Sequence, residues 1–199
     1  MSTMTGSLPG LPPHSGLILY RMDVDEYESL AGAGVLKDPR VELIDGYLVR
    51  KMTKKPRHTT ITEWLRDRLA ESLPPGWHVR KEEPVRIPSF DEPEPDLTVA
   101  HGGIKDYGDR HPGPADIALI VEVADTSLDR DRGEKLSAYA KGGVPVYWVV
   151  NLVDQWVEVY TDPDTSGRYR TRTDFKSGAQ IFCLIGEVQA CQVDAADLF

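Results

Sequence analysis

The sequence predicts an α/β domain built on a mixed central β-sheet that is flanked by helices. Two runs, at 117–123 and 146–150, have the length of strands and are apolar almost throughout, which is typical of strands buried on both faces. A segment with helical character, at about 127–141, connects them and ends at a Gly-Gly pair. Strand, helix and strand in this order predict a parallel pair joined by a right-handed crossover.

Segments upstream of this unit carry local signals of their own. Asp23, with Glu26 three residues later, resembles a capping box and predicts a short helix that starts near Asp23. An Asp-Gly pair at 45–46 lies between apolar runs and predicts a hairpin over 41–52. Apolar residues at helical spacing predict a second helix over 58–73, which a Pro-Pro-Gly sequence ends.

The remaining strand signals predict antiparallel additions to the sheet. Strand-like runs at 79–87 and 97–100 flank a polar, Pro-rich stretch, and a long loop is expected at 101–115. Two more runs, at 156–161 and 169–173, predict an antiparallel hairpin. A parallel pair extended by such a hairpin gives a mixed sheet.

Length and composition indicate one globular domain. The chain has 199 residues, of which 40% are hydrophobic and 28% charged, close to the average of globular proteins. We expect residues 1–16, rich in Ser, Thr, Gly and Pro, to be a disordered tail and residues 17–199 to form a single domain. No apolar run is long enough to span a membrane, and the first residues lack the pattern of a secretory signal, so the expected location is the cytoplasm.

Charge and cysteine content narrow the possible partners. The formal charge is −9, from 23 basic and 32 acidic residues, which argues against broad electrostatic binding of nucleic acid. A local basic face or an acidic metal site stays compatible with this balance. The two cysteines, Cys183 and Cys191, are expected to be free and buried.

Three acidic residues are candidates for chemistry. Glu122 lies inside an apolar strand, where a carboxylate is costly unless it is paired or bound to a metal. It is either a functional acid or a structural one, hydrogen-bonded to a loop or placed at the solvent-facing end of the strand. Asp96 follows a proline and, taken alone, is typical of a turn. Glu42, in the hairpin, taken alone fits an exposed strand residue.

Three further side chains have an ordinary structural interpretation beside a functional one. Lys135 follows Asp131 by four residues, so a surface ion pair on the helix explains it. His58 opens the second helix and fits an exposed helix end. Tyr139 stands one turn after Lys135 and fits the edge of a core.

Taken together and in order, these residues resemble the Uma2 family of the PD-(D/E)xK nuclease superfamily. The resemblance covers about residues 20–165 and implies a restriction-endonuclease-like core. It is carried by these segments: Val41-Glu42-Leu43-Ile44-Asp45-Gly46, His58, Pro95-Asp96-Leu97, Val121-Glu122-Val123, Asp131 through Lys135 to Tyr139, and Gly143-Val144-Pro145-Val146-Tyr147-Trp148.

The resemblance also implies a site. Asp96 matches the Asp of the PD motif, and Glu122 matches the acid of the (D/E)xK motif. The lysine of that motif is replaced by Ala124, and Lys135 on the following helix matches the family's substitute for it. Asp96 and Glu122 would hold Mg²⁺ or Mn²⁺, Lys135 would orient the attacking water, and Glu42 would complete the metal shell or hold an outer water.

Two functions remain open at this level. The first is a Mg²⁺-dependent endonuclease that hydrolyses DNA, so DNA is the expected partner. Assembly as a homodimer is left open. The second is a catalytically silent binding or assembly module with a nuclease fold, which the acidic balance favours. The first is preferred, because Asp96, Glu122 and Lys135 are all present. A basic cluster before the second helix is either a DNA-facing surface or a solvated loop: Arg50, Lys51, Lys54, Lys55 and Arg57. An active site requires Asp96, Glu122 and Lys135 to converge on one metal-sized space.

Overall fold

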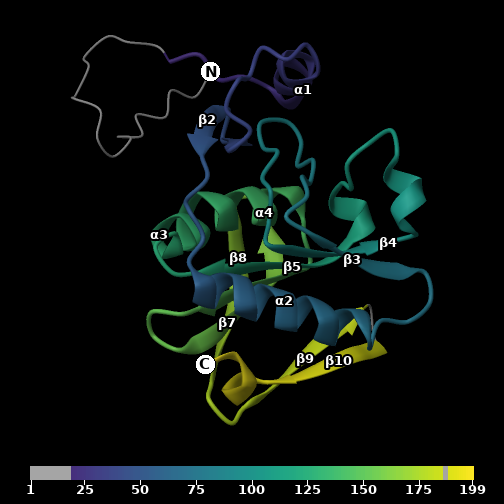
Figure 1. The fold of residues 1–199 in the computed structure, drawn as a ribbon, viewed down its shortest axis with the longest axis vertical. Coiled ribbons are helices and arrows are strands. Elements are labelled where there is room, and N and C mark those ends of the chain that lie inside the picture. The colour runs from purple at the N-terminus through teal and green to yellow at the C-terminus, as the bar shows by residue number, and fades with distance from the viewer. Residues whose placement is uncertain (1–18, 186–187) are drawn as a thin grey trace.

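A six-stranded mixed β-sheet organises the molecule (Figure 1). The computed structural model describes residues 19–185 and 188–199, so the predicted tail at 1–16 lies outside the described residues. The strand order is β3-β4-β5-β6-β7-β8, and within it β5 and β6 are parallel whereas the other neighbours are antiparallel. The strands are β3 (Trp77–Lys81), β4 (Leu97–His101), β5 (Ile117–Ala124), β6 (Val146–Asn151), β7 (Trp156–Asp164) and β8 (Arg168–Lys176). The predicted mixed sheet with its parallel pair is confirmed.

Each face of the sheet is covered by a different layer (Figure 1). On one face, helix α2 (Pro56–Ala70) and the hairpin β9 (Gln180–Ile185)–β10 (Val188–Asp194) pack on the larger apolar cluster. On the other face lies the crossover segment, which consists of α3 (Leu128–Arg130), a π-helical turn (Asp131–Lys135) and α4 (Leu136–Gly142). The buried carboxylates of the sheet therefore lie between two covering layers.

The predicted N-terminal elements form as expected. Helix α1 (Val24–Gly32) begins with the capping box, in which the Glu26 amide donates to Asp23 Oδ1 over 2.9 Å and the Asp23 amide donates to Glu26 Oε2 over 3.0 Å. The hairpin of β1 (Val41–Ile44) and β2 (Tyr47–Arg50) turns at 45–46, where both residues have positive φ, as a tight two-residue hairpin turn requires.

Several boundaries differ from the predicted ones. The strand predicted over 79–87 ends at Lys81, because Glu82 has a φ of 56° and Pro84 follows. The helix predicted over 127–141 is interrupted by the π-helical turn. The loop predicted at 101–115 contains two short 3₁₀ helices, Ile104–Tyr107 and Pro114–Asp116.

The β9–β10 hairpin has no counterpart in the sequence-based prediction. The sequence of β9 does not alternate between apolar and polar residues, although its burial does. Phe182 and Leu184 lie on its outer side, 44% and 48% exposed, and both are apolar. Cys183 lies opposite Cys191 in this hairpin, and both are free and buried, as predicted. Across residues 19–185 and 188–199, none of the helices is both long and apolar enough to cross a bilayer.

Candidate active site

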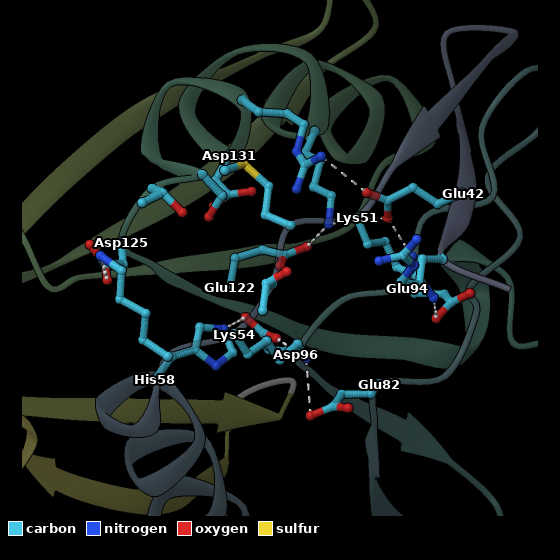
Figure 2. Close-up of a pocket in the computed structure, with 18 residues that line it drawn as sticks. Glu42, Lys51, Lys54, His58, Glu82, Glu94, Asp96, Glu122, Asp125 and Asp131 are labelled. Atoms are coloured by element: carbon cyan, nitrogen blue, oxygen red, sulfur yellow. Dashed lines mark hydrogen bonds and ion pairs between the residues drawn. The ribbon is translucent and has the colours of Figure 1, made fainter. Parts of the chain in front are cut away.

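A cavity of about 250 Å³ lies where the first residue of β4 meets the end of β5 (Figure 2). Leu97 pairs with Val121 in the antiparallel ladder, so Asp96, one residue before Leu97, is a neighbour of Glu122, one residue after Val121. The β1–β2 hairpin, the start of α2 and the crossover segment supply the other walls. All four predicted site residues, Glu42 and Lys135 included, line this one cavity.

Glu122 points toward the crossover segment. Its strand neighbours on the same side, Ile120 and Ala124, belong to the apolar cluster beneath that segment. The Glu122 Oε1 atom accepts from Lys135 Nζ and from the Tyr139 hydroxyl, each over 2.8 Å. Burial raises the pKa of Glu122 to about 8, although the charge of Lys135 opposes the shift. Glu122 is therefore a buried, ion-paired acid, neither a solvent-facing end residue nor a partner of a loop.

Lys135 joins two acids rather than one. Its Nζ atom lies 2.8 Å from Glu122 Oε1 and 3.3 Å from Glu42 Oε2. Burial disfavours its charge, but the attraction of both carboxylates raises the pKa of Lys135 overall. Among the described residues, no ion pair joins Lys135 to Asp131, so the predicted surface pair is wrong. The π-helical turn between these positions gives them a different spacing from an α-helical turn.

Glu42 is fully buried, so its interpretation as an exposed strand residue is also wrong. Its Oε2 accepts from the Glu94 amide over 3.0 Å in addition to the Lys135 ion pair. Its Oε1 lies 3.7 Å from Arg130 Nη1 and has no hydrogen-bond partner within the described part of the chain. A buried acceptor of this kind is ready to receive a hydrogen bond or a cation.

Asp96 has donors on both of its oxygens. Oδ2 accepts from the Val123 amide over 2.8 Å and lies 3.0 Å from His58 Nε2, whereas Oδ1 accepts from Lys54 Nζ over 2.9 Å. Burial alone would raise the pKa of Asp96, but the interaction with His58, aided by Lys54 and the amide, lowers it to about 2. Asp96 is thus a fixed anion beside Glu122.

His58, Tyr139 and Lys54 also belong to the site, beyond the four residues that the sequence predicts there. His58 is buried in the first turn of α2, so its interpretation as an exposed end residue is wrong. Its spacing from Ile61 and Leu65 puts it on the buried face of the helix, a signal that the sequence does contain. Local spacing does not reveal the partners of Lys54 and Tyr139, because Asp96, which binds Lys54, directly precedes β4, and Glu122, which binds Tyr139, lies on β5.

Asp131 adds a further buried carboxylate to the cavity wall (Figure 2). Its Oδ2 accepts from the Ser127 hydroxyl over 2.5 Å, and its backbone oxygen accepts from the Tyr147 hydroxyl over 2.9 Å. Its Oδ1 has no hydrogen-bond partner among residues 19–185 and 188–199. Burial raises the pKa of Asp131, and the charge of Asp131 contributes to the raised pKa of Glu122. This part of the cavity carries more acid than base.

The basic side chains around the cavity are matched by acids. None of them forms an open positive patch, because each lies within ion-pair distance of a carboxylate. The pairs are Arg40–Asp38, Lys51–Glu94, Lys54–Asp96, Lys54–Glu82, Lys55–Asp125 and Arg130–Glu42. Of the predicted basic cluster, Arg50 also pairs with Asp38.

The donor set suits a hard divalent cation. Asp96 and Glu122 offer carboxylate oxygens from neighbouring strand ends, and Mg²⁺ commonly takes one or two protein carboxylates, with water and phosphate oxygens completing its shell. In the described ranges no three His, Cys, Asp or Glu side chains gather closely enough to enclose a metal by themselves. The site therefore fits an ion shared with water and substrate, and does not fit an all-protein cage.

The sheet and its covering layers define a mixed α/β fold with two acids at adjacent strand ends. The fold is shared by the crystal structure of a "putative nuclease belonging to DUF820" from Anabaena variabilis ATCC 29413. The TM-score is 0.63 at 16% sequence identity, over 89% of this chain and 97% of that one. The chain belongs to the Uma2 family, described as "Putative restriction endonuclease", whose model matches residues 24–185. The comparison with curated proteins gave no match.

Proposed function

We propose that this protein is a divalent-metal-dependent endonuclease that hydrolyses phosphodiester bonds of DNA. The observation that carries the proposal is the meeting of Asp96, Glu122 and Lys135 at one cavity, although they come from three separate elements. The family's description as "Putative restriction endonuclease" and the fold shared with the "putative nuclease" from Anabaena variabilis support the same class of activity.

Asp96 and Glu122 would hold Mg²⁺ or Mn²⁺. When bound there, the ion would polarise the phosphodiester and lower the pKa of a bound water. The excess of buried acid over base supports such an ion, since buried carboxylates need compensating charge. Glu42 Oε1, which has no hydrogen-bond partner within the described residues, is available to hold an outer water.

The protein's own groups orient the reactants. Lys135, held by Glu122 and Glu42, presents an ammonium that stabilises negative charge developing on the phosphate. His58 and the Val123 amide fix the orientation of Asp96. Hydrolysis consumes one water: its oxygen bonds to phosphorus, one P–O ester bond breaks, and the departing oxygen is protonated.

Plasmid cleavage tests the proposal. Supercoiled DNA incubated with Mg²⁺ should be converted to nicked and linear forms, and a chelator should stop the reaction. Glu122→Gln and Asp96→Asn should lower the rate by roughly 100-fold or more, as expected when a group that acts in the transition state is removed. Asp129→Asn is the matched control, because Asp129 is an exposed acid on α3 and is not among the residues that line the cavity. This variant should cleave normally. Cleavage that persists in Glu122→Gln would exclude this site.

A catalytically silent binding module is the second candidate. The pairing of the basic side chains around the cavity favours it, because little positive charge is left to attract DNA. Wild-type protein that binds metal and DNA but leaves the plasmid intact would establish this function instead.

A further inference from the structure

The two oxygens of Asp96 accept from donors that differ in how tightly they are packed. Oδ2 is bound by the Val123 backbone amide within β5 and by His58 within α2, both parts of packed elements. Oδ1 is bound by Lys54, which lies in the segment between β2 and α2 and whose side chain is 36% exposed. Oδ1 is therefore the oxygen of Asp96 that an entering cation can bind. In the metal-free protein the ammonium of Lys54 already contacts this oxygen.

Lys54 has a second acidic partner at the cavity wall. Its Nζ atom lies 3.0 Å from Glu82 Oε1, in addition to the 2.9 Å contact with Asp96 Oδ1, and all three residues line the cavity in Figure 2. Glu82 directly follows β3 with a φ of 56°, a left-handed backbone conformation that is uncommon for a side chain of this kind. If the Asp96 contact were lost, the Glu82 ion pair would still hold Lys54 at the cavity wall, next to the oxygen on which a metal would bind.

We propose that Lys54 changes partner during the working cycle: it neutralises Asp96 in the metal-free protein and contacts a substrate phosphate once a cation occupies Asp96 Oδ1. This inference rests on the proposed function. A divalent ion binds carboxylate oxygen at about 2.1 Å, and an ammonium cannot keep the same oxygen beside it without strong repulsion. Lysine suits such an exchange because its charge sits on a flexible stem and is not tied to one geometry.

The neighbouring lysine provides a matched control. Lys55 also lines the cavity and pairs over 2.9 Å with Asp125, an acid that is not one of the two proposed metal ligands. Lys54→Met and Lys55→Met remove the same charge from adjacent positions in one loop. Only the first removes a competitor for a metal-binding oxygen.

The first measurement is calorimetric titration of Mg²⁺ into the wild type and both variants. Lys54→Met should bind Mg²⁺ roughly tenfold more tightly, as expected when a competing charge-assisted hydrogen bond is removed. Lys55→Met should stay within about twofold of the wild type, because a screened pair of exposed charges has little effect at a distance.

The second measurement is fluorescence anisotropy of a short DNA duplex, with chelator and with Ca²⁺, which takes the same kind of oxygen ligands. Lys54→Met should weaken duplex binding when Ca²⁺ is present but not when chelator is present. With Ca²⁺, the slope of log binding constant against log salt concentration should become smaller by about 1, as expected for one lost phosphate contact. With chelator its affinity should equal that of the wild type, since Lys54 is then engaged with Asp96.

Each failure has a distinct meaning. Unchanged or weaker Mg²⁺ binding in Lys54→Met would show that Lys54 does not compete for Asp96, and unchanged duplex binding in Ca²⁺ would show that it does not reach phosphate. Either result overturns the exchange while leaving the endonuclease proposal in place. A wild type that binds no divalent cation would overturn both.

Discussion

Charge balance at single residues decides what this cavity can do. Lys135 is shared by two buried carboxylates, Glu122 and Glu42, and a third, Asp131, lies nearby with an oxygen that has no hydrogen-bond partner in the described part of the chain. Arg130 also lies near Glu42, so two cations face three acids, and burial raises the pKa values of Glu122 and Asp131. A divalent ion bound here would replace the protons that balance part of this charge in the metal-free protein.

Replacing Lys135 by methionine separates its two roles. Lys135→Met keeps an unbranched side chain, shorter by the terminal nitrogen, but leaves Glu122 and Glu42 without their common cation. We expect DNA cleavage to be lost and the free energy of unfolding to fall by about 3 kcal/mol, the cost of breaking a buried ion pair from one side. Urea unfolding and plasmid cleavage measure the two effects. Lys141→Met, at an exposed position of α4, should change neither, and full cleavage by Lys135→Met would contradict the role given to this lysine.

Asp131→Asn should move stability and metal binding in opposite directions. The amide can still accept from Ser127, while the uncompensated buried charge disappears. We expect the metal-free protein to be stabilised by about 1 kcal/mol, because burying a charge without a partner is costly. Mg²⁺ affinity should fall, since the cavity loses negative charge. Thermal unfolding without metal and calorimetry with metal give the comparison; a destabilised variant with unchanged Mg²⁺ affinity would mean that Asp131 serves structure alone.

At the scale of elements, the crossover segment explains why the site lysine lies outside the strand. Ala124 occupies the strand position two residues after Glu122 and is fully buried in the cluster beneath α4. A lysine there would have to enter that packed cluster. The π-helical turn brings Lys135 to the Glu122 carboxylate from the crossover segment. Tyr139, one helical turn later, donates to the same oxygen. π-helical turns are often found where a helix carries functional residues.

Helix α1 offers a separate, pH-dependent contact. Glu92 is buried, and burial, followed by the proximity of the Glu28 carboxyl of α1, raises the pKa of Glu92 from 4.5 to about 8. Because the folded state holds this proton more tightly than the unfolded state, the stabilisation is complete below about pH 4.5. It is lost progressively as the pH rises toward 8. Arg86, which pairs with Glu28 over 2.5 Å, gives α1 an anchor that does not depend on the proton of Glu92.

We therefore expect the wild type to lose stability between about pH 5 and pH 9 more steeply than Glu92→Gln, whose side chain stays neutral. Urea unfolding across this range measures the slope, and amide hydrogen exchange in α1 locates the effect. Glu122 also titrates abnormally, but it is present in both proteins, so the difference between them isolates Glu92. Parallel pH profiles for the two proteins would exclude Glu92 as the source.

At the scale of the whole molecule, the sequence predicts what depends on local pattern. The β5–crossover–β6 unit, the capping box of α1 and the hairpin turn at 45–46 all follow from spacing and turn chemistry, and the structure confirms them. The convergence of Asp96, Glu122 and Lys135 is expected only through the family resemblance, because its motif order implies neighbouring strands.

Features that depend on tertiary contact have no such local signal. The β9–β10 hairpin escapes prediction because exposed apolar side chains hide its alternation. The interaction of His58 and Lys54 with Asp96 joins residues 38 and 42 positions apart, and no local pattern reports such a distance. Spacing predicts an α-helical turn between Asp131 and Lys135, whereas the π geometry that gives Lys135 different partners has no simple sequence signal.

Magnesium titration of three variants tests the proposed metal site most directly. Calorimetry should detect Mg²⁺ binding to the wild type, and Asp96→Asn and Glu122→Gln should each weaken it by about tenfold or more, since Mg²⁺ relies on few protein carboxylates. Asp125→Asn removes a partly exposed acid of the same cavity whose charge Lys55 balances over 2.9 Å, so this variant should bind Mg²⁺ as the wild type does. Unchanged Mg²⁺ binding in both Asp96→Asn and Glu122→Gln would contradict the proposal that these two carboxylates share a metal ion.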